Sequence, residues 1–274
     1  MHMKELSFNI ILNSIYGQYK DKISLSEWAN LLSINRSSFS RYLNNQIKSF
    51  PINKVYIIEE FLNKNDDSII NYLLRNEKKH YYHGSRNGIV GDISIHYNSS
   101  KNDFGQGFYL GESLFQSALF ILGTEGIIYE YDFDTTNLKG LYLDNLDWVY
   151  FIAYNRKIIN NNVTNINIDN YDYISGPIAD DRMAIVMESF FANQVSYDYL
   201  LECLKSMKLG NQYCLISDRC LKHIKLVETY KLSKDLKAFL YELANSRRED
   251  MLKIVNNESN KKKGKTFKDL IKHE

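Results

Sequence analysis

The sequence lacks a cysteine pattern and any long apolar run. Its three cysteines, Cys203, Cys214 and Cys220, include no C-x-x-C pair, which argues against a disulfide scaffold or a thiolate zinc site and fits a reducing compartment. No uncharged apolar stretch reaches the roughly 18–20 residues that span a bilayer. The first residues carry no basic-then-apolar signal pattern. We therefore expect a cytoplasmic protein with no membrane partner and no bound metal.

An excess of charge of one sign is lacking as well. The 274 residues contain 34 Lys and Arg against 33 Asp and Glu, a formal net charge of +1. Composition thus gives no global reason to expect nucleic-acid binding, and any basic surface would be local. The apolar fraction of 44% describes an ordinary globular protein and argues against disorder. This length allows one good-sized core, or two domains of which one is small.

The first seventy or so residues have helical patterns. An apolar stripe predicts a helix that ends at Gly17, and Ser24 and Glu27 have the spacing of a capping box that begins another. Residues 33–35 predict a tight turn before a further helix, so this segment resembles a helix-turn-helix. The residues that would face phosphates and base edges are Arg36, Ser37, Ser38, Ser40 and Arg41. A helical module that binds a protein is the alternative, and the residues leave both open.

From residue 80 the character of the sequence changes. Runs rich in Tyr, Ile and Val predict strands at 80–83, 127–133, 171–174, 212–216 and 224–230. Helices are expected at 53–62, 112–122, 143–159, 180–194, 197–207 and 233–254. Strands and helices do not alternate regularly, which favours an α+β fold. The predicted organisation is a helix-turn-helix-like module over 1–75, a catalytic domain over 76–232, and a C-terminal helix with a Lys-rich tail over 233–274.

Four short motifs follow one another in this second part. They are Tyr82-His83-Gly84-Ser85, then D-F-G-Q-G-F-Y-L at 103–110, then Ser117 and finally Phe120. Their order and spacing resemble the signature of diphtheria-toxin-type ADP-ribosyltransferases, the group that includes the poly(ADP-ribose) polymerases. The resemblance extends to a bacterial family that shares residues 176–181 and 211–214, and it covers about residues 80–230. It implies a transferase domain with a split β-sheet and NAD as the consumed substrate.

The resemblance also assigns roles that suit the residue types. Gly84 lets the backbone bond the nicotinamide carboxamide, which Ser117 also reaches, and glycine at Gly107 keeps the cleft clear. Tyr109 and Phe120 would lie on either side of the cationic ring. His83 would bond the adenine-side ribose. The NAD-binding residues implied are therefore His83, Gly84, Ser85, Gly107, Tyr109, Ser117 and Phe120.

The third catalytic position departs from the family pattern. Where chain-extending members carry N-E-Y, this sequence has Asn211-Gln212-Tyr213, so the catalytic set implied is His83, Tyr109 and Gln212. A glutamine amide can bond the ribose 2′-hydroxyl, but it brings no charge to the developing cation and is no base. Single transfer is therefore expected rather than chain elongation.

Other charged residues could compensate for the missing carboxylate. Asp180 or Asp181 could supply one, although acids are common at helix starts because of the dipole. Arg156 either reaches the NAD phosphates or ends a helix in solvent, and the second reading is favoured.

These observations predict an NAD-dependent mono-ADP-ribosyltransferase that releases nicotinamide and modifies a protein or nucleic-acid acceptor. The resemblance suggests a toxin of a toxin–antitoxin or phage-defence system, with DNA or an antitoxin bound by the N-terminal module. An NAD glycohydrolase that uses water as the acceptor is one alternative. An NAD-sensing, DNA-binding regulator with a degenerate transferase domain is another, which the glutamine at 212 keeps open.

Overall fold

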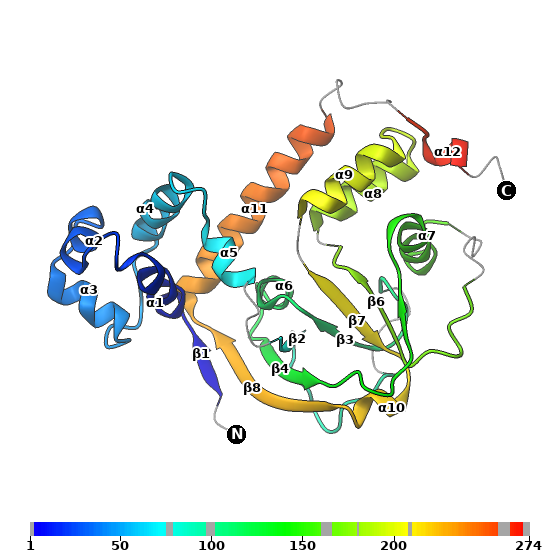
Figure 1. Ribbon diagram of the computed structural model, residues 1–274, viewed down its shortest axis with the longest axis horizontal. Helices are drawn as coiled ribbons and strands as arrows, with labels where there is room; N and C mark the ends of the chain where they lie inside the picture. The colour runs from blue at the N-terminus through cyan, green and yellow to red at the C-terminus, as the bar shows by residue number, and fades with distance from the viewer. Residues whose placement is uncertain are drawn as a thin grey trace. The chain divides into compact units, whose positions relative to one another are not determined.

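The computed structural model describes residues 3–74, 79–96, 102–159, 166–179, 181–207, 210–256 and 264–270. These residues form twelve helices and eight strands, with both parallel and antiparallel strand pairs (Figure 1). The chain divides into two compact units. Unit 1 comprises Met1–Gly88, Ser113–Glu130 and Val227–Leu243, and unit 2 comprises Ile89–Glu112, Tyr131–Leu226 and Ala244–Glu274. The fold is mixed α/β with a helical N-terminal region, as expected. The three predicted domain ranges remain a prediction.

The N-terminal helices of unit 1 are α1 Phe8–Tyr19, α2 Leu25–Leu31, α3 Arg36–Leu43, α4 Ile52–Asn63 and α5 Ile69–Leu74. The capping box is confirmed, since Ser24 Oγ accepts from the Glu27 amide at 3.3 Å and Glu27 Oε2 accepts from the Ser24 amide at 2.7 Å. Ser33, in the turn between α2 and α3, has a φ of +49°, in the left-handed region that glycine adopts most easily.

The expected helix end at Gly17 is wrong. Helix α1 continues through this residue to Tyr19, with Lys20 still helical at its C-cap. Tyr19 is buried, and its ring packs edge-on to Phe61 with centroids 5.3 Å apart. The two additional residues therefore bury an aromatic side chain, which outweighs the preference of glycine for a helix end.

The core of unit 1 joins segments from distant parts of the chain. Trp28 is fully buried, and its ring centroid lies 4.8 Å from that of Phe61. Phe8 stacks on Phe50 and meets Phe239 edge-on, with centroids 5.3 and 5.8 Å apart. Phe239 belongs to helix α11, Lys234–Asn256, so the N-terminal helices share their core with the first turns of this late helix.

Four strands, in the order β1-β8-β4-β2, lie wholly or mostly in unit 1. They are β1 Lys4–Leu6, β8 Ile224–Leu232, β4 Ile127–Phe133 and β2 Tyr81–Ser85. β1 runs parallel to β8, with Lys4 opposite Tyr230. Helix α6, Leu114–Phe120, packs on β2.

Four strands also follow one another in unit 2, in the order β3-β7-β6-β5. They are β3 Phe108–Gly111, β7 Asn211–Leu215, β6 Tyr173–Pro177 and β5 Gly140–Tyr142. β7 is antiparallel to both neighbours, and β5 is parallel to β6. The helices are α7 Asn145–Asn155, α8 Asp181–Phe191, α9 Tyr197–Met207, α10 Asp218–Leu221 and α12 Phe267–Leu270. Six consecutive residues of α7, from Trp148 to Ala153, are buried.

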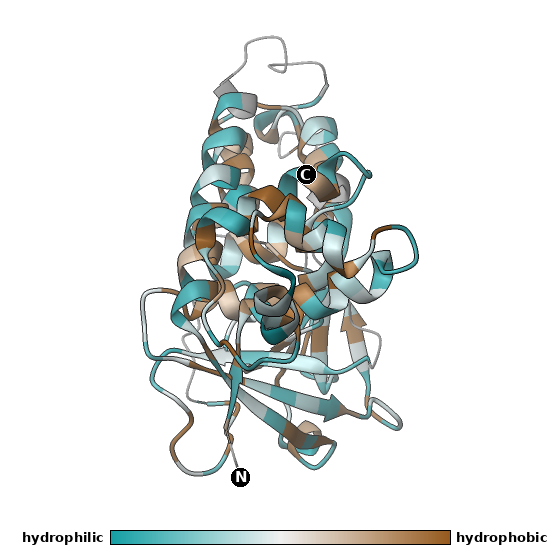
Figure 2. Cartoon of the chain, turned by 90° about the vertical axis from the view of Figure 1, so that its left-hand side faces the viewer, coloured by the Kyte–Doolittle hydropathy of each residue, from teal (hydrophilic) through white to brown (hydrophobic). Residues whose placement is uncertain are grey.

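Most of the predicted elements occur in the structure. The strand expected at 127–133 and the helix expected at 197–207 have the predicted bounds. β1, β3 and β5 were not predicted, because strands of three or four residues carry too little periodicity. Figure 2 shows hydrophilic residues interspersed with hydrophobic ones along the helices. Among the described residues, no helix is both long and apolar enough to cross a membrane.

Candidate functional site

The first motif lies on β2 in unit 1, where Gly84 faces helix α6. A Cβ atom at Gly84 would lie 2.7 Å from the carbonyl oxygen of Ser117 and 3.3 Å from the Phe120 ring. Real Cβ atoms do not approach a backbone oxygen so closely, so β2 can pack against α6 at this distance only with glycine. The structure thus brings together the predicted residues Gly84, Ser117 and Phe120, with His83 and Ser85 flanking the glycine on the strand.

Phe120 is the most accessible of these residues. Its side chain is 53% exposed, whereas Ser117 is buried. The Arg86 guanidinium lies 4.8 Å from the Phe120 ring centroid, and Arg86 Nε donates to the Phe120 carbonyl oxygen at 3.1 Å. Arg86 was not among the predicted site residues. It covers one face of the aromatic ring to which the resemblance assigns stacking on nicotinamide.

The buried carboxylate of Glu130 pairs with His80, the residue directly before β2. Glu130 on β4 contacts the His80 ring and the Tyr230 hydroxyl. Burial, together with the charge of Glu130, raises the pKa of Tyr82 to about 12. Because side chains alternate along a strand, Tyr82 and His83 point to opposite faces of β2. The His83 ring lies beside that of Tyr129, with centroids 6.3 Å apart.

The second motif lies in unit 2, where Tyr109 on β3 closes its own loop. Its hydroxyl accepts from the Phe104 amide at 2.9 Å and donates to the Gly105 carbonyl oxygen at 2.8 Å. Gly105 has a φ of +83°, which the turn requires and which glycine adopts without strain. Burial, followed by the neighbouring Cys214 thiol, raises the pKa of Tyr109. The tyrosine is therefore a neutral, anchored aromatic side chain.

Strand β7 brings Gln212 to the same face as Tyr109. In the antiparallel register, Tyr109 is opposite Cys214 and Gly111 is opposite Gln212, and directly opposed residues share a face. A Cβ at Gly107 would lie 2.6 Å from the Leu215 carbonyl oxygen and would also collide with the Cys214 sulfur. The structure thus brings together Gly107, Tyr109 and Gln212.

A carboxylate faces Gln212, although it is not one of those expected. Gln212 Nε2 donates to Asp103 Oδ2 at 2.9 Å. Arg156 Nε donates to Asp103 Oδ1 at 2.7 Å, and a second guanidinium nitrogen contacts the same oxygen. Asn155 Nδ2 donates to the Asp103 carbonyl oxygen at 2.9 Å. The favoured reading of Arg156 as a solvent-exposed helix end is wrong, because its side chain is 27% exposed and ion-paired.

Asp103 is thus a site residue to which sequence reasoning gave no role, and the pairing of Arg156 with it was not predicted either. The sequence feature that could have pointed to Asp103 is an acidic residue directly before the F-G-x-G run. Of the compensating acids that were considered, Asp180 lies outside the described residues, and so does the side chain of Asp181, whose backbone begins α8.

The five residues considered for nucleic-acid contact all lie on α3. Arg36, Ser37 and Arg41 are exposed, and Ser38 and Ser40 are half-buried. The Ser37 hydroxyl donates to the helix-capping oxygen of Asn35 at 2.7 Å, as does the Ser38 amide. Arg36 and Arg41 are therefore the cations that this helix presents to solvent.

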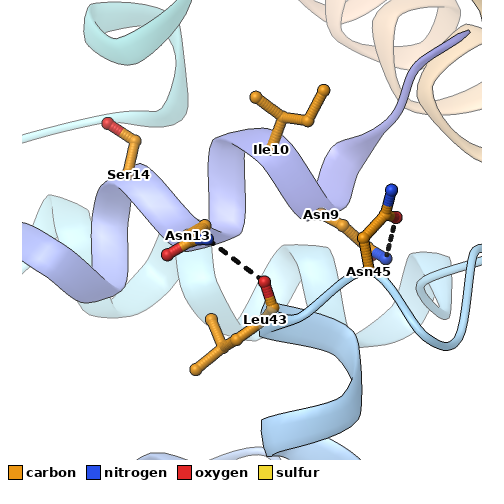
Figure 3. Close-up of a pocket in the computed structure, with 6 residues that line it drawn as sticks. All are labelled: Asn9, Ile10, Asn13, Ser14, Leu43 and Asn45. Carbon is orange, nitrogen blue, oxygen red and sulfur yellow. Dashed lines mark hydrogen bonds between the residues drawn. The ribbon is translucent and has the colours of Figure 1, made fainter.

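A separate pocket of about 350 Å³ lies between α1 and the end of α3 (Figure 3). Asn9 Nδ2 donates to Asn45 Oδ1 at 3.2 Å and Asn13 Nδ2 donates to the Leu43 carbonyl oxygen at 3.1 Å. These bonds tie the two helices together. The lining residues are Asn9, Ile10, Asn13, Ser14, Leu43 and Asn45, and none of the predicted site residues is among them.

Within the part of the chain that the structure describes, no three His, Cys, Asp or Glu residues form a group that could hold a metal ion.

The family model described as "Protein of unknown function (DUF3990)" matches residues 80–226. The chain belongs to this family. The matched segment begins one residue before β2 and ends within β8. It therefore contains both motifs and Gln212, and α1 to α5 lie outside it. The comparisons with curated proteins and with solved structures gave no match.

Proposed function

We propose that the protein is an NAD-dependent mono-ADP-ribosyltransferase. The observation that carries this proposal is the ordered set of motifs from His83 to Gln212, within which Gly84 and Gly107 both occupy positions without room for a Cβ atom. Glycines at such positions are requirements of the local packing.

Each motif contributes chemistry that suits a nicotinamide. The proposal gives Gly84 the backbone bonds to the carboxamide and Ser117 a hydroxyl bond to it, with Ser85 beside them on β2. Tyr109 supplies an anchored aromatic ring, and an aromatic face attracts a cationic pyridinium. His83 bonds the ribose on the adenine side.

In the proposed reaction the bond between C1′ of the nicotinamide ribose and the pyridinium nitrogen breaks, and its electron pair stays with nicotinamide, which leaves neutral. C1′ then forms a bond to an oxygen or nitrogen of the acceptor, whose proton goes to solvent. Gln212 has no charge to stabilise the ribosyl cation and cannot accept the acceptor's proton. The proposal is therefore single transfer to an acceptor that is itself a good nucleophile.

A tagged NAD analogue in bacterial lysate tests this function. Label should appear in protein or nucleic acid together with released nicotinamide, and His83→Ala and Tyr109→Ala should abolish labelling. Retained labelling in both variants would refute the assignment of the site. Rapid release of nicotinamide from NAD alone, without labelled acceptor, would instead identify an NAD glycohydrolase.

The helices α2 and α3 support a second candidate, an NAD-sensing regulator that binds DNA. They are joined by a tight turn, and α3 exposes Arg36 and Arg41, which suits contacts to phosphates. Gel retardation with the wild type and with an Arg36→Ala/Arg41→Ala variant tests this. Loss of salt-dependent retardation in the variant, together with NAD binding but no turnover, would favour the regulator over the transferase. The same module could serve a toxin by binding an antitoxin or a target.

A further inference from the structure

The Gln212 side chain has a defined orientation in unit 2. Its Nε2 faces Asp103 Oδ2 at 2.9 Å and the Pro177 carbonyl oxygen at 3.4 Å. A carboxylate paired with a guanidinium and a backbone carbonyl can only accept hydrogen bonds. If the amide were reversed, its oxygen would face two other oxygens. Both amide hydrogens are thus directed toward these acceptors, and the amide oxygen points away from them.

Asp103 is itself held from two sides. Arg156 ion-pairs with its Oδ1, and Asn155, the last residue of α7, donates to its carbonyl oxygen. The Asp103 side chain is only 13% exposed. Arg156 also offsets the charge of the carboxylate, so the pair brings little net charge to Gln212. What remains is a charge-assisted hydrogen bond with a fixed direction.

We infer that Asp103 is a positioning residue, which fixes Gln212 so that its amide oxygen accepts a hydrogen bond from a ribose hydroxyl of NAD. The inference rests on the proposed function. Glutamate at this position would offer an oxygen acceptor whichever way its carboxylate turned. Glutamine offers an oxygen acceptor to the ribose only when its amide is held in one orientation. Glutamine at position 212 therefore requires a neighbouring group that accepts a hydrogen bond from its amide nitrogen. Asp103 meets that requirement.

Three variants test the inference by changing which of the two side chains, at positions 103 and 212, is a carboxylate. Asp103→Asn supplies an amide that can itself donate, so the orientation of Gln212 is no longer imposed. Gln212→Glu places two carboxyl groups within hydrogen-bond distance, and such groups cannot both ionise without cost. The double variant Asp103→Asn/Gln212→Glu restores one amide and one carboxylate with the positions exchanged. Nicotinamide release and acceptor labelling are measured for each as a function of pH, with kcat and KM separated.

The expected results follow from the direction of the bond. Asp103→Asn should lower kcat about tenfold or more, because misorientation of a contacting group costs on that order. Gln212→Glu should acquire a pH dependence that the wild type lacks, since one of its paired carboxyls holds a proton. The double variant should be more active than either single variant and should lose that pH dependence.

Asp172→Asn is the matched control. Asp172 is also a carboxylate of unit 2 that is paired with an arginine, Arg219, at 3.1 Å. It precedes β6, whereas Gly176, the residue opposite Gln212, lies toward the other end of that strand. This substitution should lower the midpoint of thermal unfolding and leave kcat per folded molecule unchanged.

Two failures are distinguishable. If the wild type releases no nicotinamide and labels nothing, the proposed function is wrong, and so is the proposed hydrogen bond between Gln212 and the ribose. If the wild type is active and Asp103→Asn keeps kcat and KM within twofold, the function stands and the positioning role is wrong. An Asp103→Asn variant that loses activity only in proportion to its loss of folded protein, without rescue in the double variant, also overturns the inference.

Discussion

The two motifs are built by different means, although the resemblance assigns both to one substrate. On β2 and α6 of unit 1 the geometry depends on close backbone packing, because Gly84 lies against the Ser117 carbonyl oxygen and leaves no space for a side chain. On β3 and β7 of unit 2 it depends largely on hydrogen bonds, because Tyr109 closes its loop and Asp103 holds Gln212. The stability of the first region should therefore be most sensitive to added volume, and the stability of the second should be most sensitive to the loss of single polar atoms.

The largest effect is expected from added volume at the first motif. Gly84→Ala should lower the free energy of unfolding by about 1–3 kcal/mol, since a methyl group inserted into a packed region forces the backbone to shift, and labelling from NAD should be lost. Denaturant unfolding measures the change. Gly17→Ala is the control, because Gly17 has no atom within 4 Å of the added methyl and alanine in a helix should stabilise by about 0.5–1 kcal/mol. Equal destabilisation by both would show that close packing is not the cause.

The next effect tests the hydrogen bonds of the second motif. Tyr109→Phe removes the hydroxyl that bonds the Phe104 amide and the Gly105 carbonyl oxygen. Leaving the backbone donor of the buried residue Phe104 unpaired should lower the free energy of unfolding by about 1–2 kcal/mol, with a fall in kcat as the loop loosens. Tyr142→Phe, at an exposed tyrosine of the same unit, should change neither quantity. If the two variants behaved alike, the hydroxyl of Tyr109 would have no role in holding the loop.

A pH titration tests the second region further, because the cysteines lie in unit 2. Burial raises the pKa of Cys214 to about 12, against about 8.5 in an unfolded chain. The neutral thiol is the form that the folded state favours. Its contribution is therefore complete below about pH 8.5, and the free energy of unfolding should fall as pH rises from there toward 12. Burial also raises the pKa of Cys220 to about 12, so Cys214→Ala should make this part of the curve shallower without removing the slope. An unchanged slope between about pH 8.5 and 10, below the range in which tyrosines titrate, would contradict the contribution of Cys214.

The sequence predicted the second motif less completely than the first, and the reasons are physical. Gly84, Ser117 and Phe120 come together through one strand and the helix that packs on it, so short-range spacing was sufficient to place them. Gln212 and Asp103 are joined across more than a hundred residues by the pairing of β3 with β7. Nothing in the local pattern reveals such a contact.

The same reasoning explains which helical features were predictable. The capping box at Ser24 and Glu27 is encoded by residues three apart, and it is confirmed. The end of α1 depends on whether Tyr19 is buried against Phe61, a residue of α4. A local rule about glycine therefore placed that helix end too early, because a tertiary contact decided it.

The smallest effect concerns Arg86, the residue of the first motif that sequence reasoning missed. Its guanidinium covers one face of Phe120 and bonds the carbonyl oxygen of the same residue. Exposed cation–π contacts contribute about 0.5–1 kcal/mol, so Arg86→Gln should lower the free energy of unfolding by no more than that. A double-mutant cycle with Phe120→Leu isolates the contact between the two side chains.

A coupling free energy near zero would show that the contact between the guanidinium and the ring contributes nothing to stability, and that Arg86 is held only by its hydrogen bond to the backbone. A measurable coupling would mean that a nicotinamide stacking on Phe120 must use the ring's other face or displace Arg86. Under the proposed function, Arg86→Gln should in that case also lower the KM for NAD, because it removes a steric barrier to stacking on Phe120.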